Sequence, residues 1–150
     1  MSVNGALSAE RPPILLVLDA NVLVAELLKQ RGRRLLADPR LQLTITEQAW
    51  SETMHELRKR GRTLAARNQP LADTIEEAIA FADALIARIP EPQYQDLIAE
   101  AARRIPDPDD VPTVALALAT NAAIWTADEH FWGGGLAVWR TERLVAYLGL

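Results

Sequence analysis

The sequence contains no cysteine and only two histidines among its 150 residues. The lack of cysteine excludes disulfide bonds, thiolate metal sites and a cysteine nucleophile, and it is compatible with a reducing cytoplasm. His55 and His130 are far apart and show no zinc-ligand spacing, so we interpret both as surface residues and expect no histidine near a functional site. Any metal site is then built from oxygen ligands, which favours magnesium or manganese over zinc.

The chain also lacks long apolar runs and a strong net charge. No run reaches the ~18 apolar residues that span a membrane, and residues 1–11 contain no basic region followed by an apolar core, the pattern of a secretion signal. We therefore expect no membrane partner, a cytoplasmic location, and a flexible tail at 1–12 before a single domain at 13–150. A net charge of −4 does not favour nucleic-acid binding by bulk electrostatics, but it permits binding through a metal and a local basic patch.

The most informative stretch is Ile14–Leu23, which reads ILLVLDANVL. Its five apolar residues from Ile14 to Leu18 suit a strand buried on both faces, and Asp19 follows directly at the strand end. Ligands of open α/β sheets bind beyond the carboxyl ends of the strands. A carboxylate at that edge is costly to desolvate unless something pairs with it. Asp19 is therefore either a metal or phosphate ligand or the N-cap of the next helix.

Further patterns predict strands that alternate with helices. The predicted strands are Ile14–Leu18, Leu41–Ile45, Ala122–Thr126 and Ala137–Trp139. The predicted helices are Val22–Leu36 with an interruption near Gly32, Glu47–Arg60 capped by Thr46 and ended by Gly61, Leu71–Ile89, Gln93–Ile105, Val111–Asn121, and Glu142–Leu148 capped by Thr141. This alternation predicts an α/β fold with a parallel sheet of about four strands and right-handed crossovers.

Four carboxylates fall where one site at the carboxyl edge of such a sheet needs them. Asp19 and Asp128 end strands, and Asp110 begins the helix that leads into the third strand. Glu52 lies in the first two turns of the helix after the second strand, where Glu47 and Glu56 compete for the same role. Glu56 is one turn, about 5.4 Å, further from the strand ends, which favours Glu52 over it. Each acid also has an ordinary explanation, as a cap, a turn residue or a solvated helix residue. Their joint occurrence favours a single site.

Carboxylates that lie close together repel one another and raise one another's pKa, and divalent cations are the usual reason that a fold keeps them. One or two Mg²⁺ or Mn²⁺ ions would activate a water and stabilise the leaving oxygen in phosphodiester hydrolysis. Basic residues gather at Lys29–Arg34 and at Arg58–Arg62. They are either solvated helix ends, which complement the helix dipole, or contacts to an RNA backbone.

Four segments of the chain together resemble the PIN domain. They are LLVLDANVL, TITEQAWSE, DPDDVPTVALALA and IWTAD, and they extend in order over about Ile14 to Leu148. The resemblance implies a three-layer α/β/α fold with a central parallel sheet. It also implies a metal-dependent ribonuclease site.

Residue by residue, the resemblance implies four acids that are both catalytic and metal-binding, with Mg²⁺ or Mn²⁺ as the cofactor. These acids are Asp19, Glu52, Asp110 and Asp128. Glu52 is assigned because it follows, by six residues, the small polar residue that Thr46 matches. The resemblance adds four helpers, namely Asn21, Asp107, Asp109 and Thr126.

Many single-domain bacterial members are similar to toxins of the VapC type, which cleave RNA and are silenced by a cognate antitoxin, often as homodimers. The resemblance therefore implies an RNA substrate, an antitoxin partner and a homodimer. This chain differs from most such toxins in its longer leading tail and in the longer stretch between Glu52 and Asp110. The alternative is a catalytically weak or silent PIN-fold interaction module, for which the apolar stripe of Leu71–Ile89 offers a binding surface.

Overall fold

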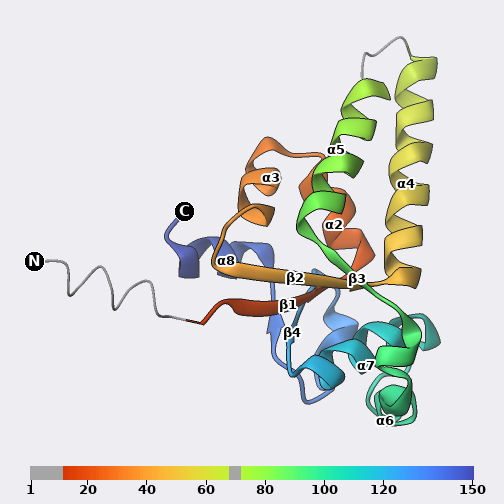
Figure 1. The fold of residues 1–150 in the computed structure, drawn as a ribbon, viewed down its shortest axis with the longest axis vertical. Coiled ribbons are helices and arrows are strands. Elements are labelled where there is room, and N and C mark those ends of the chain that lie inside the picture. Colours follow the sequence, from red (N-terminus) through yellow and green to blue (C-terminus); the bar gives the residue numbers. More distant parts are fainter. Residues whose placement is uncertain (1–11, 68–71) are drawn as a thin grey trace, which may run out of the picture.

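The computed structural model describes residues 12–67 and 72–150, which form a five-stranded parallel sheet between two layers of helices (Figure 1). The strands are β1 (Ile14–Leu18), β2 (Leu41–Thr46), β3 (Ala87–Ile89), β4 (Ala123–Trp125) and β5 (Val138–Trp139), in the spatial order β3-β2-β1-β4-β5. The predicted parallel α/β/α fold is confirmed. The expected count of about four strands is one short, because β3 falls inside a predicted helix.

Helices of very different length cover the sheet. They are α2 (Ala20–Leu27), α3 (Gln30–Leu36), α4 (Glu47–Ala66), α5 (Ala72–Leu85), α6 (Ile98–Arg104), α7 (Val111–Thr120) and α8 (Thr141–Leu148), with short 3₁₀ turns η1 (Glu91–Gln93), η2 (Gln95–Leu97), η3 (Pro108–Asp110) and η4 (Glu129–Phe131). None of the helices in the described ranges combines the length and apolar character that a membrane crossing requires. The predicted flexible tail lies, apart from Pro12, outside the described residues.

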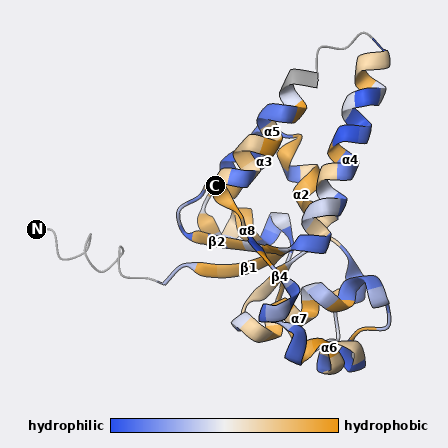
Figure 2. Cartoon of the chain, turned by 45° about the vertical axis from the view of Figure 1, so that its right-hand side comes forward, coloured by the Kyte–Doolittle hydropathy of each residue, from blue (hydrophilic) through white to orange (hydrophobic). Residues whose placement is uncertain are grey.

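The sheet has a core on each face because its central strand β1 is buried on both sides. Leu16 and Leu18 belong to the core that α2, α3, α4, α5 and α8 cover, whereas Val17 belongs to the core under α6 and α7. All three side chains are fully buried. Figure 2 shows β1 and β2 mostly in hydrophobic colours and more hydrophilic residues along α4. Burial against the two cores therefore explains the unbroken apolar run of β1, as the sequence pattern indicates.

Two glycines have roles different from those predicted. The helix after Asp19 breaks at Leu28–Lys29 rather than near Gly32, which lies inside α3. A Cβ at Gly32 would overlap the backbone of Glu26, so this glycine permits the close crossing of α2 and α3. Gly61 does not end α4, which continues to Ala66. An added Cβ at Gly61 would lie 3.1 Å from Cγ1 of Ile75 in α5, so Gly61 lets the two long helices approach closely.

Two predicted helices are shorter than expected. The helix predicted over Leu71–Ile89 ends at Leu85, and Ala87–Ile89 instead pairs with β2 as the edge strand β3. Its first predicted residue, Leu71, lies outside the described residues. The helix predicted over Gln93–Ile105 begins as 3₁₀ turns and becomes α-helical only at Ile98.

The two threonine caps have opposite outcomes. Thr46 caps α4, since its hydroxyl accepts a 3.0 Å hydrogen bond from the backbone N–H of Ala49. Thr141 is the first residue of α8 and does not cap it. Its hydroxyl instead accepts from Nε1 of Trp125 at 3.0 Å and donates to the buried carboxylate of Glu26 at 3.2 Å. Thr141 therefore ties α8 to β4 and α2.

Candidate metal centre

The carboxyl ends of β1 and β4 lie side by side and position the first acids. Leu18 pairs with Trp125, and the N–H of Asp19 donates to the carbonyl of Trp125 at 3.1 Å. Thr126 follows β4, and its hydroxyl donates to Oδ2 of Asp19 at 2.8 Å. The same hydroxyl accepts from the N–H of Asp128 at 2.9 Å. Thr126 thus links Asp19 to the loop that carries Asp128.

Asp19 lies immediately before α2 but makes no capping hydrogen bond with its side chain. Burial raises the pKa of Asp19, the hydrogen bond from Thr126 and the nearby backbone N–H of Asn21 oppose this effect, and the negative charge of Asp128 adds to it. A capping role alone does not explain why Thr126 binds this carboxylate close to Asp128. A bound cation would favour the ionised form that this environment disfavours.

Asp110 reaches the same edge from the turn η3, just before α7. It occupies the N-cap position of α7, yet its side chain makes no capping hydrogen bond. Its Oδ2 is buried and has no hydrogen-bond partner among the described residues. Burial, followed by the charges of Asp107, Asp128 and Asp19, raises the pKa of Asp110 to about 6. An unpaired buried oxygen of this kind is costly, and a cation would satisfy it.

Asp110, Asp128 and His130 each offer one ligand atom, and these atoms lie within 4.8 Å of one another. Oδ1 of Asp128 accepts from the backbone N–H of His130 at 2.9 Å, and Nδ1 of His130 lies 3.3 Å from the same oxygen. The expectation that no histidine lies near the acids is therefore wrong, although His130 is exposed as predicted. The turn η4 brings His130 back toward Asp128, and the short Asp-x-His spacing is its only signal in the sequence.

These donors fit a divalent cation. Carboxylate oxygens are the ligands that Mg²⁺ and Mn²⁺ prefer, and an imidazole adds a ligand that later transition metals accept more readily. Asp19 is not one of the three residues within 4.8 Å. It still adds to the local negative charge, because it contributes to the raised pKa of Asp110. The unbonded Oδ2 of Asp110 marks the point where the site lacks a positive partner.

Glu52 is not one of the three residues whose ligand atoms lie within 4.8 Å of one another. It is exposed on α4, and its Oε1 accepts from the side chain of Gln48 at 3.4 Å. With Asn21 it lines an open hollow of about 540 Å³, to which Glu56 and Arg60 also contribute. Glu52 thus lies on the helix after β2, as predicted, and shares a hollow with Asn21, which is two residues after Asp19.

The remaining helpers differ in their contacts. Oδ1 of Asp107 accepts from the backbone N–H of Asp109 at 2.9 Å, which shapes the turn η3 before Asp110. Asp109 is exposed. Asp107 lies close enough to raise the pKa of Asp110, whereas Thr126 directly contacts Asp19. Asp107 and Thr126 therefore shape the site, and no contact of the Asp109 side chain with it is present among the described residues.

A family model described as PIN domain matches residues 17–149. The chain belongs to the PIN-domain family. No curated protein matches this PIN domain, but several solved structures share its fold. VapBC2 from Rickettsia felis, bound to a DNA fragment from their promoter, is 16% identical with a TM-score of 0.58, covering 85% of this chain and 98% of that chain.

Two further structures are similar to this PIN domain. PAE2754 from Pyrobaculum aerophilum is 16% identical with a TM-score of 0.64, covering 91% of this chain and 90% of that chain. FitAcB from Neisseria gonorrhoeae is 19% identical with a TM-score of 0.52, covering 83% of this chain and 96% of that chain. At these identities the similarity is one of fold, and the chemistry has to be argued from the residues described above.

Proposed function

We propose that this PIN domain is an endoribonuclease that hydrolyses RNA phosphodiester bonds with Mg²⁺ or Mn²⁺. The observation that carries the proposal is the convergence of Asp19, Asp110 and Asp128 from three separate segments, with an unbonded carboxylate oxygen among them. Carboxylates so close together disfavour one another's ionised forms unless a cation lies between them. A metal centre would explain the convergence of all three acids, whereas capping accounts only for Asp128, whose side chain accepts from the N–H of His130 at the start of η4.

The chemistry would be divided between the cation and the chain. A bound cation supplies an activated water and stabilises the charge of the leaving oxygen. Asp110 and Asp128 would hold the cation, and Asp19, oriented by Thr126, would complete the acidic edge. All three acids remain partly exposed. Unpaired RNA, whose backbone is accessible, would suit such an open edge better than a duplex.

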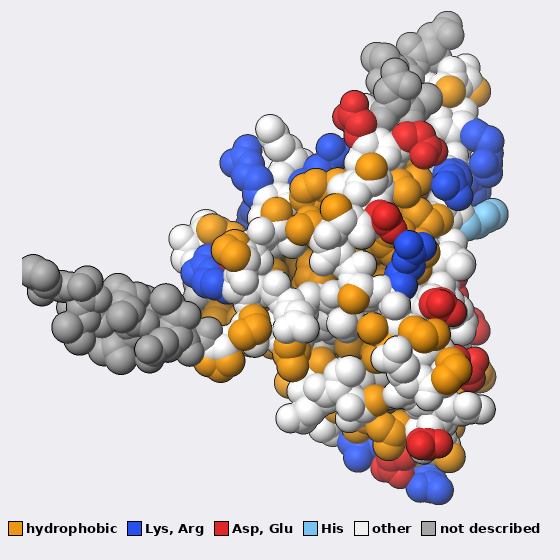
Figure 3. Space-filling model, viewed as in Figure 1, with side chains coloured by type: hydrophobic (Ala, Val, Ile, Leu, Met, Phe, Trp, Pro, Cys, Tyr) orange, Lys and Arg blue, Asp and Glu red, His pale blue; other side chains and the backbone are white. Residues whose placement is uncertain are grey.

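We propose Glu52 as a fourth acid on the strength of the family resemblance, together with Asn21, which lines the same hollow. Basic side chains gather along the outer side of α4 (Figure 3). The exposed basic residues of this part of α4 are Arg58, Lys59, Arg60 and Arg62. Arg60 lines the hollow beside Glu52, where it would meet an RNA phosphate. In the other basic segment, Nε of Arg33 instead donates to the carbonyl of Leu27 at 2.7 Å, which is a structural role.

The biological role that we propose is that of a toxin silenced by a cognate antitoxin in the cytoplasm. The fold similarity to VapBC2 and FitAcB supports this role. An acidic edge on a chain of net charge −4 would attract an arginine or lysine of the inhibitor, which would pair with the carboxylates and exclude the metal. A natural complex whose partner binds only the opposite edge of the sheet would contradict this proposal.

A second copy of the chain is a further proposed partner, which sedimentation of the purified protein tests.

The alternative function is a catalytically weak or silent interaction module. The observation that favours it is that the exposed Glu52 is not part of the metal-spaced group of Asp110, Asp128 and His130, because a site with three acids holds a metal less firmly than one with four. Metal binding without cleavage of any RNA would support the alternative.

The deciding experiment is incubation of the purified protein with single-stranded and structured RNAs in Mn²⁺, in Mg²⁺ and in EDTA. We expect metal-dependent cleavage by the parent and a loss of roughly 100-fold or more in Asp19→Asn, because a metal centre contributes several kcal/mol to transition-state stabilisation. The matched control is Asp96→Asn, since Asp96 is exposed on η2 and should leave the rate unchanged. Equal cleavage with metal and with EDTA would contradict the proposal.

A further inference from the structure

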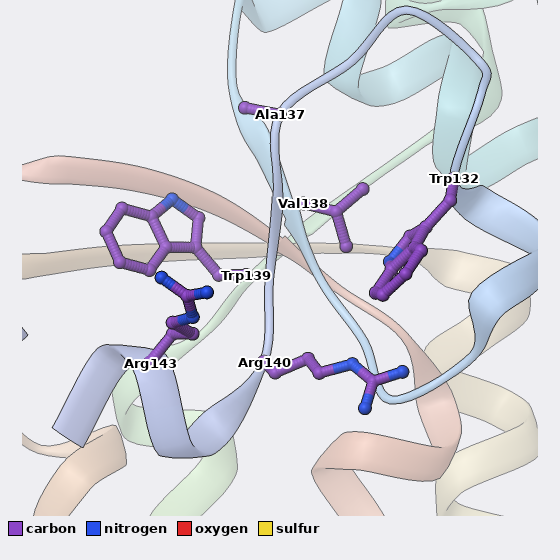
Figure 4. A pocket seen from close by; sticks show the side chains of 6 residues that line it. All are labelled: Trp132, Ala137, Val138, Trp139, Arg140 and Arg143. Atoms are coloured by element: carbon purple, nitrogen blue, oxygen red, sulfur yellow. The ribbon is translucent and has the colours of Figure 1, made fainter. Parts of the chain in front are cut away.

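A second feature of the molecule adjoins the acidic edge, at the edge strand β5. An open hollow of about 680 Å³ lies there, and Figure 4 shows the side chains that line it: Trp132, Ala137, Val138, Trp139, Arg140 and Arg143. We propose that this hollow binds one unpaired nucleotide of the RNA substrate, with its base stacked on Trp132, its phosphate held by Arg140 and a flanking phosphate held by Arg143. The inference rests on the proposed ribonuclease function and assigns it a substrate subsite.

The hollow is next to the acids because β5 is the parallel neighbour of β4. The N–H of Thr126 donates to the carbonyl of Trp139 at 3.0 Å, so Arg140 emerges at the edge that carries the acids. Trp132 follows η4, four residues after Asp128. At a rise of about 2 Å per residue in a 3₁₀ turn, their backbones are separated by roughly 8 Å. A nucleotide in the hollow would therefore lie beside the phosphodiester bond that reaches the acids.

Trp132 has the exposure and support of a stacking platform. Its side chain is 56% exposed, whereas Trp50 is 7% and Trp125 0% exposed. The guanidinium of Arg140 lies 4.8 Å from the centre of the Trp132 ring, which holds the ring in place from one side. Figure 4 shows the ring on the Val138 side of the strand, close to Arg140. Stacking of a base on such a ring tolerates any sequence because every base has a flat apolar face.

The two arginines have guanidinium nitrogens that a phosphate can reach. In Arg140 this is Nη2, which donates to Glu129 at 3.3 Å, because its Nε is buried and has no acceptor among the described residues. The carboxylate side chain of Glu129 is 75% exposed, so this ion pair is weak and a phosphate can replace it. Arg143 is exposed on α8 and forms no ion pair within the described ranges. Figure 4 shows Arg140 and Arg143 on opposite sides of β5, so the two guanidinium groups would hold two successive phosphates rather than one.

A protein segment is the other occupant that an edge strand can accept, through backbone pairing. The described part of β5 is only two residues long, so it offers few backbone hydrogen bonds to an added strand. The groups that distinguish this hollow are an exposed indole and two arginines, and these suit a base and a phosphate. The observations therefore favour a nucleotide.

The test measures the affinity for a short fluorescein-labelled single-stranded RNA by anisotropy in EDTA, where metal-dependent cleavage is absent. We expect Trp132→Ala to weaken binding about 5- to 150-fold, the range of one base–aromatic stack, and Trp132→Phe to retain most of the affinity. Arg140→Ala and Arg143→Ala should each reduce the slope of log affinity against log salt by about 0.7, the loss of one phosphate contact. Trp132→Ala should leave that slope unchanged.

Arg88→Ala is the matched control. The Arg88 guanidinium lies 4.7 Å from the ring of the buried Trp50, at the opposite edge strand β3. It repeats the arginine-on-tryptophan geometry away from the hollow, so its removal should not change RNA affinity. Circular dichroism melting of every variant checks that the fold is intact.

Cleavage of the same RNA by the parent in Mn²⁺ separates the two proposals. If the parent cleaves RNA and the Trp132 and both arginine variants bind it as tightly as the parent, the subsite is wrong and the ribonuclease function stands. If the parent neither binds nor cleaves any RNA, both proposals are overturned. If Trp132→Ala weakens self-association in sedimentation while RNA affinity is unchanged, the hollow belongs to an interface between two copies of the chain.

Discussion

The hydroxyl of Thr126 donates a 2.8 Å hydrogen bond to Oδ2 of Asp19, although the two residues are 107 positions apart in the sequence. The same hydroxyl accepts the backbone N–H of Asp128, and the Thr126 residue is only 1% exposed. One buried hydroxyl therefore sets the relative position of two acids that the chain delivers from different strands.

Thr126→Val tests this role. The substitution keeps the volume but leaves the N–H of Asp128 without its acceptor, so we expect the free energy of unfolding to fall by about 1–3 kcal/mol. The pKa of Asp19 should rise further, because the lost hydrogen bond lowers it. Urea unfolding in EDTA measures the stability. Thr120→Val is the control, since that hydroxyl donates to the carbonyl of Leu116 at the end of α7 and should contribute about 0.5 kcal/mol or less. Equal losses in both variants would contradict the account.

Asp110→Asn should change how the stability of the metal-free protein depends on pH. Burial and three neighbouring acids raise the pKa of Asp110 from 3.8 to about 6. Because the folded pKa lies above the unfolded value, the folded state binds the proton more tightly. The stabilisation that this proton provides is therefore lost as the pH rises from about 4 through about 6. The variant should be more stable than the parent above pH 6, and the difference should shrink toward pH 4.

Thermal unfolding in EDTA across this range measures the effect. Asp109→Asn is the matched control, because Asp109 is exposed one residue earlier and should give no such gain. If the parent and Asp110→Asn have the same melting temperature at every pH, Asp110 is not crowded by the other acids.

Much of the fold follows from local patterns, and the errors have identifiable causes. The five apolar residues of β1 predict a strand buried on both faces, and in the structure Leu16, Val17 and Leu18 are fully buried. Strand β3 is misinterpreted as helix because three residues are too few to show a period of two. Gly61 is misinterpreted as a helix end because its reason is tertiary, namely the approach of Ile75 from α5.

The candidate site is predictable in its acids but not in its geometry. Strand ends locate Asp19 and Asp128, since parallel strands place their carboxyl ends on one edge. Whether Asp110 caps α7 depends on a side-chain rotamer that the sequence does not specify. The approach of His130 depends on the turn η4, and the distance of Glu52 from the other acids depends on how α4 packs.

Glu52→Gln tests whether Glu52 contributes to cleavage although the other acids do not crowd it. We expect RNA cleavage to fall about tenfold or more, as for groups that support a metal site. Stability in EDTA should change by no more than about 0.5 kcal/mol, because Glu52 is exposed and is not part of the metal-spaced group. Glu56→Gln is the control, since Glu56 lines the same hollow but pairs with Arg60 at 3.4 Å. Equal losses of cleavage in the two variants would show that Glu52 contributes no more to cleavage than Glu56 does.

His130→Ala should alter which metals the site prefers. Imidazole is a good ligand for Ni²⁺, whereas Mg²⁺ prefers oxygen, so we expect Ni²⁺ affinity to fall about tenfold and Mg²⁺ affinity to fall less. Calorimetric titration of each ion measures the two affinities. His55→Ala is the control, because the other histidine lines the hollow beside Glu52 and lies outside the metal-spaced group. If His130→Ala loses affinity for both ions to the same extent, His130 is not a ligand of the metal.

The most direct test of the metal centre is a calorimetric titration of Mn²⁺ into the parent, Asp110→Asn and Asp109→Asn. Asp110 has a buried oxygen without a hydrogen-bond partner among the described residues, whereas Asp109 is exposed one position away. We predict saturable Mn²⁺ binding to the parent, the same affinity in Asp109→Asn, and an affinity at least about tenfold lower in Asp110→Asn. Absence of saturable binding to the parent, or equal affinities in all three proteins, would contradict the assignment of this acidic edge as a metal centre.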